Sequence, residues 1–187
     1  MNIQKFITAL FIAAISFSTI ANNTNPDKDK KETVKNTHTQ ETIVGVAAGN
    51  ENFSTLVAAV KAAGLVDVLN SDGPFTVFAP TNDAFGKLPE GTIATLLKAE
   101  NKELLTAILT YHVVAGKFVA KDVIDAIKKN KGKFVIKTVQ GNTLTASLKG
   151  GKVILTDAKG TISTIVITDV AASNGVIHAI DMVVMPK

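Results

Sequence analysis

Residues 75–85 read FTVFAPTNDAF, and this segment holds a strand, a turn and the start of a helix. Its first five residues are mostly β-branched or aromatic and end at Pro80, which favours a short strand because proline cannot continue a hydrogen-bond ladder. Thr81, Asn82 and Asp83 follow, and short polar side chains of this kind accept hydrogen bonds from the free amides of a first helical turn. We therefore predict a structural role for these three residues, where a strand turns sharply into a helix.

Helical patterns lie on both sides of this segment. Before it, apolar residues recur at helical spacing after Ser54, which is the expected cap, and the pattern stops at Gly64. After it, the same spacing predicts short helices over 92–98, 101–110 and 122–129.

Strand patterns dominate the last third of the chain. Apolar and hydroxyl side chains alternate over 143–148, and the Lys149–Lys152 segment with its two glycines predicts a hairpin turn. Helices that come first and strands that come later indicate an α+β domain. The predicted strands are 111–114, 134 onward, 143–148, 153–156, 162–170 and 176–185.

Two segments precede the predicted domain. Residues 1–21 read as a secretory signal peptide, because Lys5 precedes an almost wholly apolar run and small residues follow it. A short membrane anchor is the alternative reading. Residues 22–40 are polar and are expected to form a disordered linker, because they offer little apolar surface to bury. The folded domain is expected over 41–187, in a secreted or periplasmic protein without a mature transmembrane span.

Composition argues against several classes of function. The 187-residue chain carries 20 basic residues, all of them lysine, and 16 acidic residues. Arginine grips phosphates and base edges with a planar fork, and its absence disfavours specific nucleic-acid binding. The sequence contains no cysteine, which excludes disulfides, thiolate metal sites and cysteine nucleophiles.

Few residues of the predicted domain are suited to catalysis. From Glu41 onward the only histidines are His112 and His178, and we find no nucleophile elbow, phosphate-cradling loop or metal-ligand spacing. We therefore expect that the protein is not an enzyme and uses no cofactor or metal.

The segment Asn174–Asp181 reads NGVIHAID and contains a second set of structural candidates. Asn174 and Gly175 are typical of a tight turn with positive φ. His178 lies among apolar residues, where a polar ring must find hydrogen-bond partners, so we expect it to hold a loop; a binding role and a metal ligand are the alternatives. Asp181 is placed on the opposite face of the strand from His178, without a predictable partner.

Tyr111, His112 and Val113 form the first candidate interaction site. If they belong to one strand, the phenol and the imidazole point to opposite sides of it, and one of them faces outward. Two readings stay open. In one, Tyr111 is in the core and His112 bonds to the backbone; in the other, the strand presents an exposed recognition patch, a setting in which tyrosine is favoured.

Lysines are concentrated between residues 117 and 137, where Asp122 and Asp125 are the only acidic residues. A solvated helix end explains this pattern, because lysine is favourable near a helix carboxyl terminus. A weak, salt-sensitive contact with an anionic polysaccharide or lipid surface is the alternative.

Several of these motifs together resemble a fasciclin domain. The motifs that show this resemblance follow the order and spacing of that family: FTVFAPTNDAF at 75–85, Tyr111-His112, NGVIHAID at 174–181 and the closing Met185-Pro186. The resemblance spans residues 41–187. It implies an α+β fold in which a β-wedge or sandwich of about seven strands is decorated by several short helices.

The resemblance also implies function by contact rather than by catalysis, in adhesion and matrix proteins and in secreted bacterial proteins. In animal relatives, a Tyr-His motif and an Asp-Ile pair are associated with integrin binding. They correspond here to Tyr111-His112 and to Asp169-Val170, where Val170 replaces the isoleucine. Asp169 and Val170 are therefore carried as candidate contact residues.

We expect an exported, non-catalytic fasciclin-like protein that mediates cell adhesion or interaction with a surface or matrix through an exposed patch. Its partner is expected to be a surface protein or a polysaccharide, and the chain is expected to be monomeric or weakly self-associating. A different class of function is the alternative: a carrier for a small ligand such as a lipid or metabolite, or an envelope-stress protein.

Overall fold

A seven-stranded sheet organises the fold, with the strand order β2-β1-β7-β6-β5-β4-β3. The computed structural model describes residues 41–187. The expected signal peptide at 1–21 and linker at 22–40 lie outside the described residues. The strands are β1 (Phe75–Pro80), β2 (Val113–Ala115), β3 (Lys133–Lys137), β4 (Thr143–Lys149), β5 (Lys152–Thr156), β6 (Ile162–Ala172) and β7 (Gly175–Ile180).

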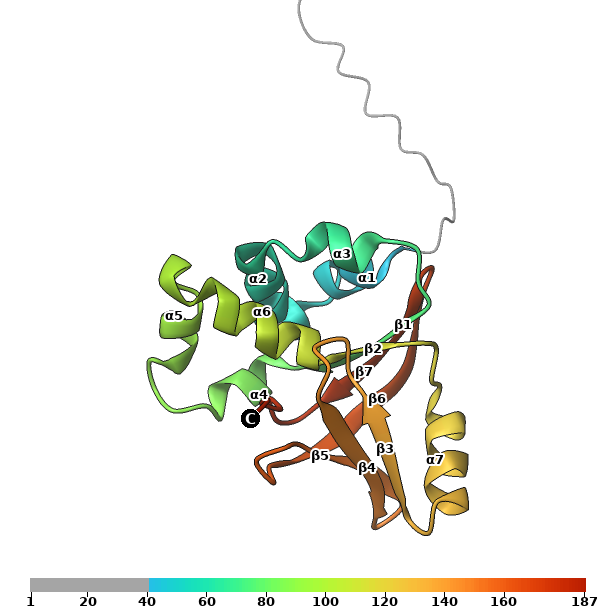
Figure 1. Ribbon diagram of the computed structural model, residues 1–187. Helices are drawn as coiled ribbons and strands as arrows, with labels where there is room; N and C mark the ends of the chain where they lie inside the picture. Colours follow the sequence, from blue (N-terminus) through green and yellow to red (C-terminus); the bar gives the residue numbers. More distant parts are fainter. Residues whose placement is uncertain (1–40) are drawn as a thin grey trace, which may run out of the picture. The chain divides into compact units, whose positions relative to one another are not determined.

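The sheet combines two parts through one long strand (Figure 1). β1 pairs in parallel with β7, in the register Phe78↔His178, whereas the other pairings are antiparallel. β6 pairs with β5 over Ile162–Thr164 and with β7 from Ile165 to Ala172, with register shifts on either side of Ile167. Beyond β3, the Val139 amide donates to the Val113 carbonyl of β2 over 2.8 Å, so the two ends of the sheet nearly meet.

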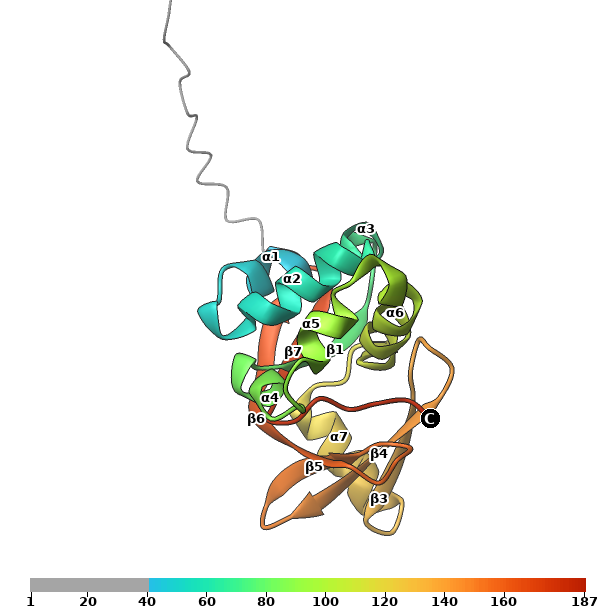
Figure 2. The ribbon, with the colours of Figure 1, turned by 90° about the vertical axis from the view of Figure 1, so that its left-hand side faces the viewer.

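Most helices gather on one side of β1 and β7, while α7 packs against β3 and β4 (Figures 1 and 2). The chain follows the expected order of helices and then strands, which confirms the α+β class with seven strands. The helices are α1 (Ile43–Ala48), α2 (Ser54–Ala63), α3 (Val66–Asn70), α4 (Asn82–Gly86), α5 (Thr92–Leu96), α6 (Lys102–Tyr111) and α7 (Ala120–Lys129), with short 3₁₀ turns at Glu51–Phe53 and Ala99–Asn101.

Two apolar clusters hold these parts together. One joins the helices to alternate residues of the central strands, such as Val77 of β1 and Ile177 of β7. The other joins α7 to β3–β5 and to the opposite face of the central strands, through residues such as Phe78 and Ile180. Both faces of β1 and β7 are therefore covered, which explains why these strands are buried along nearly their whole length.

Neither α1 nor α3 was predicted from the sequence, and several predicted boundaries differ from those observed, three of them in segments that matter for the site. α6 continues through Tyr111, so the predicted strand begins two residues later, at Val113. β7 ends at Ile180, and residues 181–187 form no strand. Ser54 is the first residue of α2 rather than its cap, and the Thr55 amide is instead capped by a residue from another segment.

Candidate functional site

The expected recognition patch at Tyr111, His112 and Val113 is buried. These residues are 0%, 2% and 5% exposed. Because α6 reaches Tyr111, His112 extends the buried helical row of Leu105, Ile108 and Leu109 into the core instead of lying on a strand. Of the two readings of this segment, the exposed patch is therefore wrong, because of the helical phase of the segment. The structure shows the other reading, with Tyr111 in the core and His112 bonded to the backbone.

Tyr111 connects helix α6 to the part of the sheet that β4 and β5 form. Its hydroxyl donates to the Thr143 carbonyl over 2.8 Å and accepts from the Ala158 amide over 3.2 Å. Burial raises the pKa of the Tyr111 hydroxyl, opposed by the bond from Ala158. The phenol therefore serves as a buried link between α6, β4 and the loop after β5.

His112 is a neutral ring enclosed by protein. Its Nε2 accepts from the Val184 amide over 3.3 Å, so the ring proton lies on Nδ1 and is donated to the Ile108 carbonyl over 2.8 Å. Burial lowers the pKa of His112 to about 4, although the bond to Ile108 and the charge of Asp157 act in the opposite direction. Both nitrogens are used by the backbone, so the ring has no free position for a substrate or metal.

His178 carries its proton on the other nitrogen. Nδ1 accepts from the Asp169 amide over 3.2 Å, so Nε2 donates to the Phe118 carbonyl over 2.8 Å. The ring is 0% exposed and stacks on Phe78 with centroids 5.8 Å apart. Within residues 41–187, no group of three or more histidine, cysteine or acidic side chains is placed to hold a metal ion.

Asp169 is exposed, but its backbone amide and its carboxylate both form hydrogen bonds. It adopts φ 59°, in the left-handed region, and its Oδ1 accepts from the Ala120 amide over 2.8 Å. Val119, the residue before α7, provides no capping side chain. Asp169 therefore caps α7 from a distant strand, while Val170 is half-buried and packs against the helical cluster.

The three candidates after β1 have separate roles. Thr81 caps α4, because its hydroxyl accepts from the Ala84 amide over 3.3 Å. Asn82 turns away and accepts from the Thr55 amide over 3.0 Å, so it caps α2. Asp83 is exposed in the first turn of α4, where a negative charge is favourable.

Asn174 joins three segments at the turn before β7. Its Oδ1 accepts from the Ile43 amide over 2.9 Å, and its Nδ2 donates to the carbonyls of Leu69 and Ser71 over 2.7 and 3.0 Å.

Gly175 is required at this turn for its close approach to another strand. Neither Asn174 nor Gly175 has positive φ, so that part of the prediction is corrected. A Cβ on Gly175 would collide with the carbonyl oxygen of Phe75. The absence of a side chain therefore lets β7 lie against β1.

Two carboxylates fix the end of the chain. Asp181 accepts from the Thr164 amide over 2.7 Å. Asp157 is 6% exposed, and its Oδ2 accepts from the Met185 amide over 2.9 Å while Oδ1 accepts from the Lys159 and Thr161 amides over 2.9 and 2.8 Å. Our sequence reasoning missed Asp157, although the Asp157–Gly160 turn was a signal that it holds its own loop.

Large apolar side chains are exposed on β6. Ile162, Val166 and Ile167 are 50%, 49% and 43% exposed, and we call them the β6 patch. A register shift between Ile165 and Ile167 places two residues opposite Ala179 and turns both Val166 and Ile167 toward solvent. The candidate contact residues Asp169 and Val170 follow directly along the same strand.

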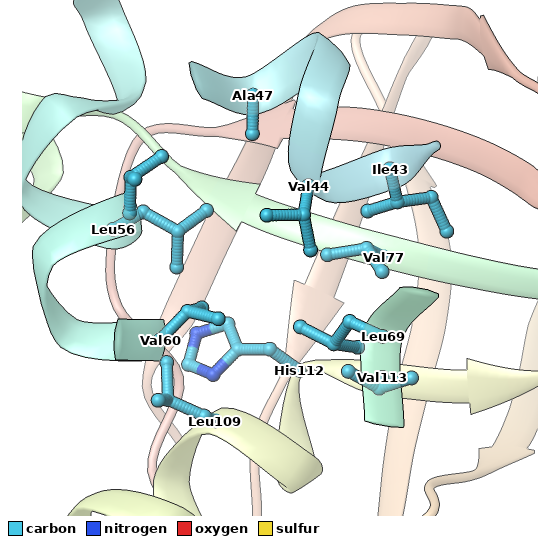
Figure 3. A pocket seen from close by; sticks show the side chains of 11 residues that line it. Ile43, Val44, Ala47, Leu56, Val60, Leu69, Val77, Leu109, His112 and Val113 are labelled. Atoms are coloured by element: carbon cyan, nitrogen blue, oxygen red, sulfur yellow. The ribbon is translucent and has the colours of Figure 1, made fainter. Parts of the chain in front are cut away.

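An apolar pocket of about 30 Å³ lies between the helices and β1 (Figure 3). The His112 ring points into it, surrounded by aliphatic side chains. Pockets that bind drug-sized ligands have volumes of roughly 300–1,000 Å³, so this space is much too small for a lipid. Its lining includes Ile43, Leu56, Val60, Val77, Leu109 and Val113.

No helix within residues 41–187 has the length and apolar character needed to cross a membrane.

The fold matches a solved structure. A pair of FAS1 domains from the insect cell adhesion molecule fasciclin I superposes with a TM-score of 0.69 at 19% identity, covering 79% of this chain and 51% of that one. The family model of the fasciclin domain matches residues 51–186. The chain belongs to the fasciclin domain family.

Relatives span bacteria and animals. Protein sll1483 of Synechocystis is 49% identical over 96% of this chain and 93% of its own length. The immunogenic protein MPB70 of Mycobacterium bovis is 40% identical, over 79% of this chain and 70% of its own. The pig transforming growth factor-beta-induced protein ig-h3 is 38% identical over 78% of this chain, which spans only 19% of that protein.

Proposed function

We propose that the protein is exported and non-catalytic, and that it mediates cell adhesion or contact with a surface or matrix through the β6 patch. The observation that carries this proposal is the exposure of three large apolar side chains on one strand. Exposed apolar side chains that gather on one element are a feature of interaction sites. The likeness to an insect cell adhesion molecule supports the class of function.

The buried polar groups support a non-catalytic role. Both imidazoles are neutral, closed to solvent and bonded to backbone atoms at both ring nitrogens. A general acid or base needs access to a substrate proton, which these rings lack. The small volume of the apolar pocket argues against a role for that pocket in carrying a lipid.

Export rests on the leader pattern at residues 1–21, followed by the polar linker at 22–40. Amino-terminal sequencing of the native protein from fractionated cells tests it. We expect the mature chain to begin at Asn22 in a secreted or periplasmic fraction; a chain that starts at Met1 in the cytoplasm contradicts export.

The β6 patch is tested by binding of the immobilised full chain to envelope material of its host. The double variant Val166→Asp/Ile167→Asp removes apolar contact and is expected to weaken binding by about tenfold or more. The matched control is Val68→Asp/Leu104→Asp, because those residues are 50% and 51% exposed and the charge change is equal. Equal loss in both variants, or no loss in the first, contradicts the assignment of the patch.

The domain is proposed to act as a monomer or weakly associating unit. A single β6 patch of three apolar side chains gives modest affinity, whereas several linked copies of the domain raise the avidity without any new contact. Adhesion strength is therefore expected to depend on the density of chains displayed on a surface.

A further inference from the structure

The outer face of β3, β4 and β5 is open to solvent. Residues paired directly across antiparallel strands point to the same face. The pairs Val135↔Thr145 and Thr145↔Thr156 therefore define one face, and the pair Ile136↔Leu144 belongs to the other. The second face is buried against α7 and the core, whereas Val135 on the first is 59% exposed.

Four lysines stand on this outer face. Lys133 and Lys137 alternate with Val135 along β3, and Lys149 pairs with Lys152 at the hairpin between β4 and β5. All four side chains are exposed, and none forms an ion pair within residues 41–187. We call these residues the lysine face.

The sequence that forms β3, β4 and β5 contains no acidic residue. Between Asp125 and Asp157 the sequence contains no aspartate or glutamate and seven lysines. The three lysines outside the lysine face lie at the end of α7, which covers the other face of the sheet, and in the loop that leads into β3; two of them, Lys128 and Lys129, lie near Asp125. The additional lysines are Lys128, Lys129 and Lys131.

Hydroxyl groups lie between these charges. Register places Thr143, Thr145, Ser147 and Thr156 on the outer face, between the two pairs of lysines. Lys133 and Lys137 are four residues apart on an extended strand, a separation of about 13 Å. The face thus offers spaced positive charges with hydrogen-bonding hydroxyls between them.

We propose that the lysine face binds an acidic polysaccharide, a ligand different from the partner proposed for the β6 patch. The two surfaces adjoin at Ile162, which pairs with Thr156 and so points to the same face. Spaced carboxylate or sulfate groups of an extended chain complement lysines spread over a flat sheet, and sugar hydroxyls complement the threonine and serine side chains. The face carries no aromatic side chain for stacking on bases or for anchoring at a lipid interface. The observations therefore favour a polysaccharide over a nucleic acid or a membrane.

Binding of the full chain to immobilised polygalacturonate and dextran sulfate tests the proposal, with uncharged dextran as the reference matrix. The variant Lys133→Gln/Lys137→Gln/Lys149→Gln/Lys152→Gln is expected to bind about tenfold or more weakly at low salt, and the wild-type binding is expected to decline as salt rises. Circular dichroism and the melting temperature establish that the variant is folded.

The control Lys61→Gln/Lys98→Gln/Lys102→Gln/Lys159→Gln removes equal charge from exposed positions outside the lysine face. Retained binding by this control supports the proposal. An equal loss in both variants shows attraction by net charge alone and overturns it, as does the absence of binding to either polyanion. Tighter binding to vesicles of equal parts phosphatidylcholine and phosphatidylglycerol assigns the face to membranes and also overturns it.

Discussion

At the scale of single residues, buried polar side chains hold segments of the fold together. The contribution of one of them, His112, to stability depends on pH. The folded state holds the ring neutral, with a pKa lowered by burial to about 4, against 6.5 for the free side chain. The unfolded chain therefore binds a proton below pH 6.5 that the folded chain excludes until about pH 4. This linkage makes acid a destabilising condition for the fold.

We predict that the free energy of unfolding contributed by His112 falls as the pH drops from 6.5 toward 4, by up to about 3 kcal/mol, and then levels off. Urea unfolding at steps across this range measures it. His112→Gln removes the titrating group and is expected to flatten the pH dependence. A variant with the same slope as the wild type contradicts the role of His112.

The close approach of β1 and β7 gives a second residue-scale prediction. Gly175→Ala places a methyl group against the Phe75 carbonyl, and the strands must separate to accept it. We expect a loss of about 2 kcal/mol or more in unfolding free energy. Gly86→Ala is the control, because a Cβ at Gly86 meets no atom within 4 Å, and it is expected to be near neutral. Equal stability of the two variants argues against the close approach.

Among the elements, α7 depends on a side chain contributed by β6. Asp169→Ala removes the cap from the Ala120 amide and is expected to cost about 1 kcal/mol. Asp169→Asn keeps an acceptor oxygen and tolerates the left-handed backbone, so it should recover most of that loss. Hydrogen exchange at the first turn of α7 reads the effect locally. Unchanged exchange in Asp169→Ala means that the cap does not stabilise the helix.

Local patterns predicted most elements, and long-range contacts account for the differences. The alternation over 143–148 and the glycine pair after it gave the β4–β5 hairpin, because both signals are local. The caps supplied by Asn82 and Asp169 come from residues 27 and 49 positions away, which no local pattern contains. The Tyr111 boundary was wrong because tyrosine and valine favour strands, whereas in the structure α6 packs on α2 and continues for one more residue, through Tyr111.

At the scale of the whole molecule, the sequence indicated which polar side chains have a structural role, but it did not indicate which segments they connect. Thr81, Asn82, Asn174 and His178 stood out as residues with structural chemistry, but which segments they join follows only from the fold. The exposed β6 patch could not be predicted, because β-branched residues in a strand pattern look the same whether they face the core or solvent. A register shift at Ile165 decides that question here.

The division of the molecule into a buried frame and exposed contact surfaces is the central claim. Hydroxyl-radical footprinting of the full chain, free and bound to envelope material of its host, tests this claim most directly because it reports side-chain exposure. We predict that oxidation of Ile162, Val166 and Ile167 falls on binding, while that of Val68 and Leu104 stays constant. Unchanged oxidation on β6 together with protection of Val68 or Leu104 would contradict the account.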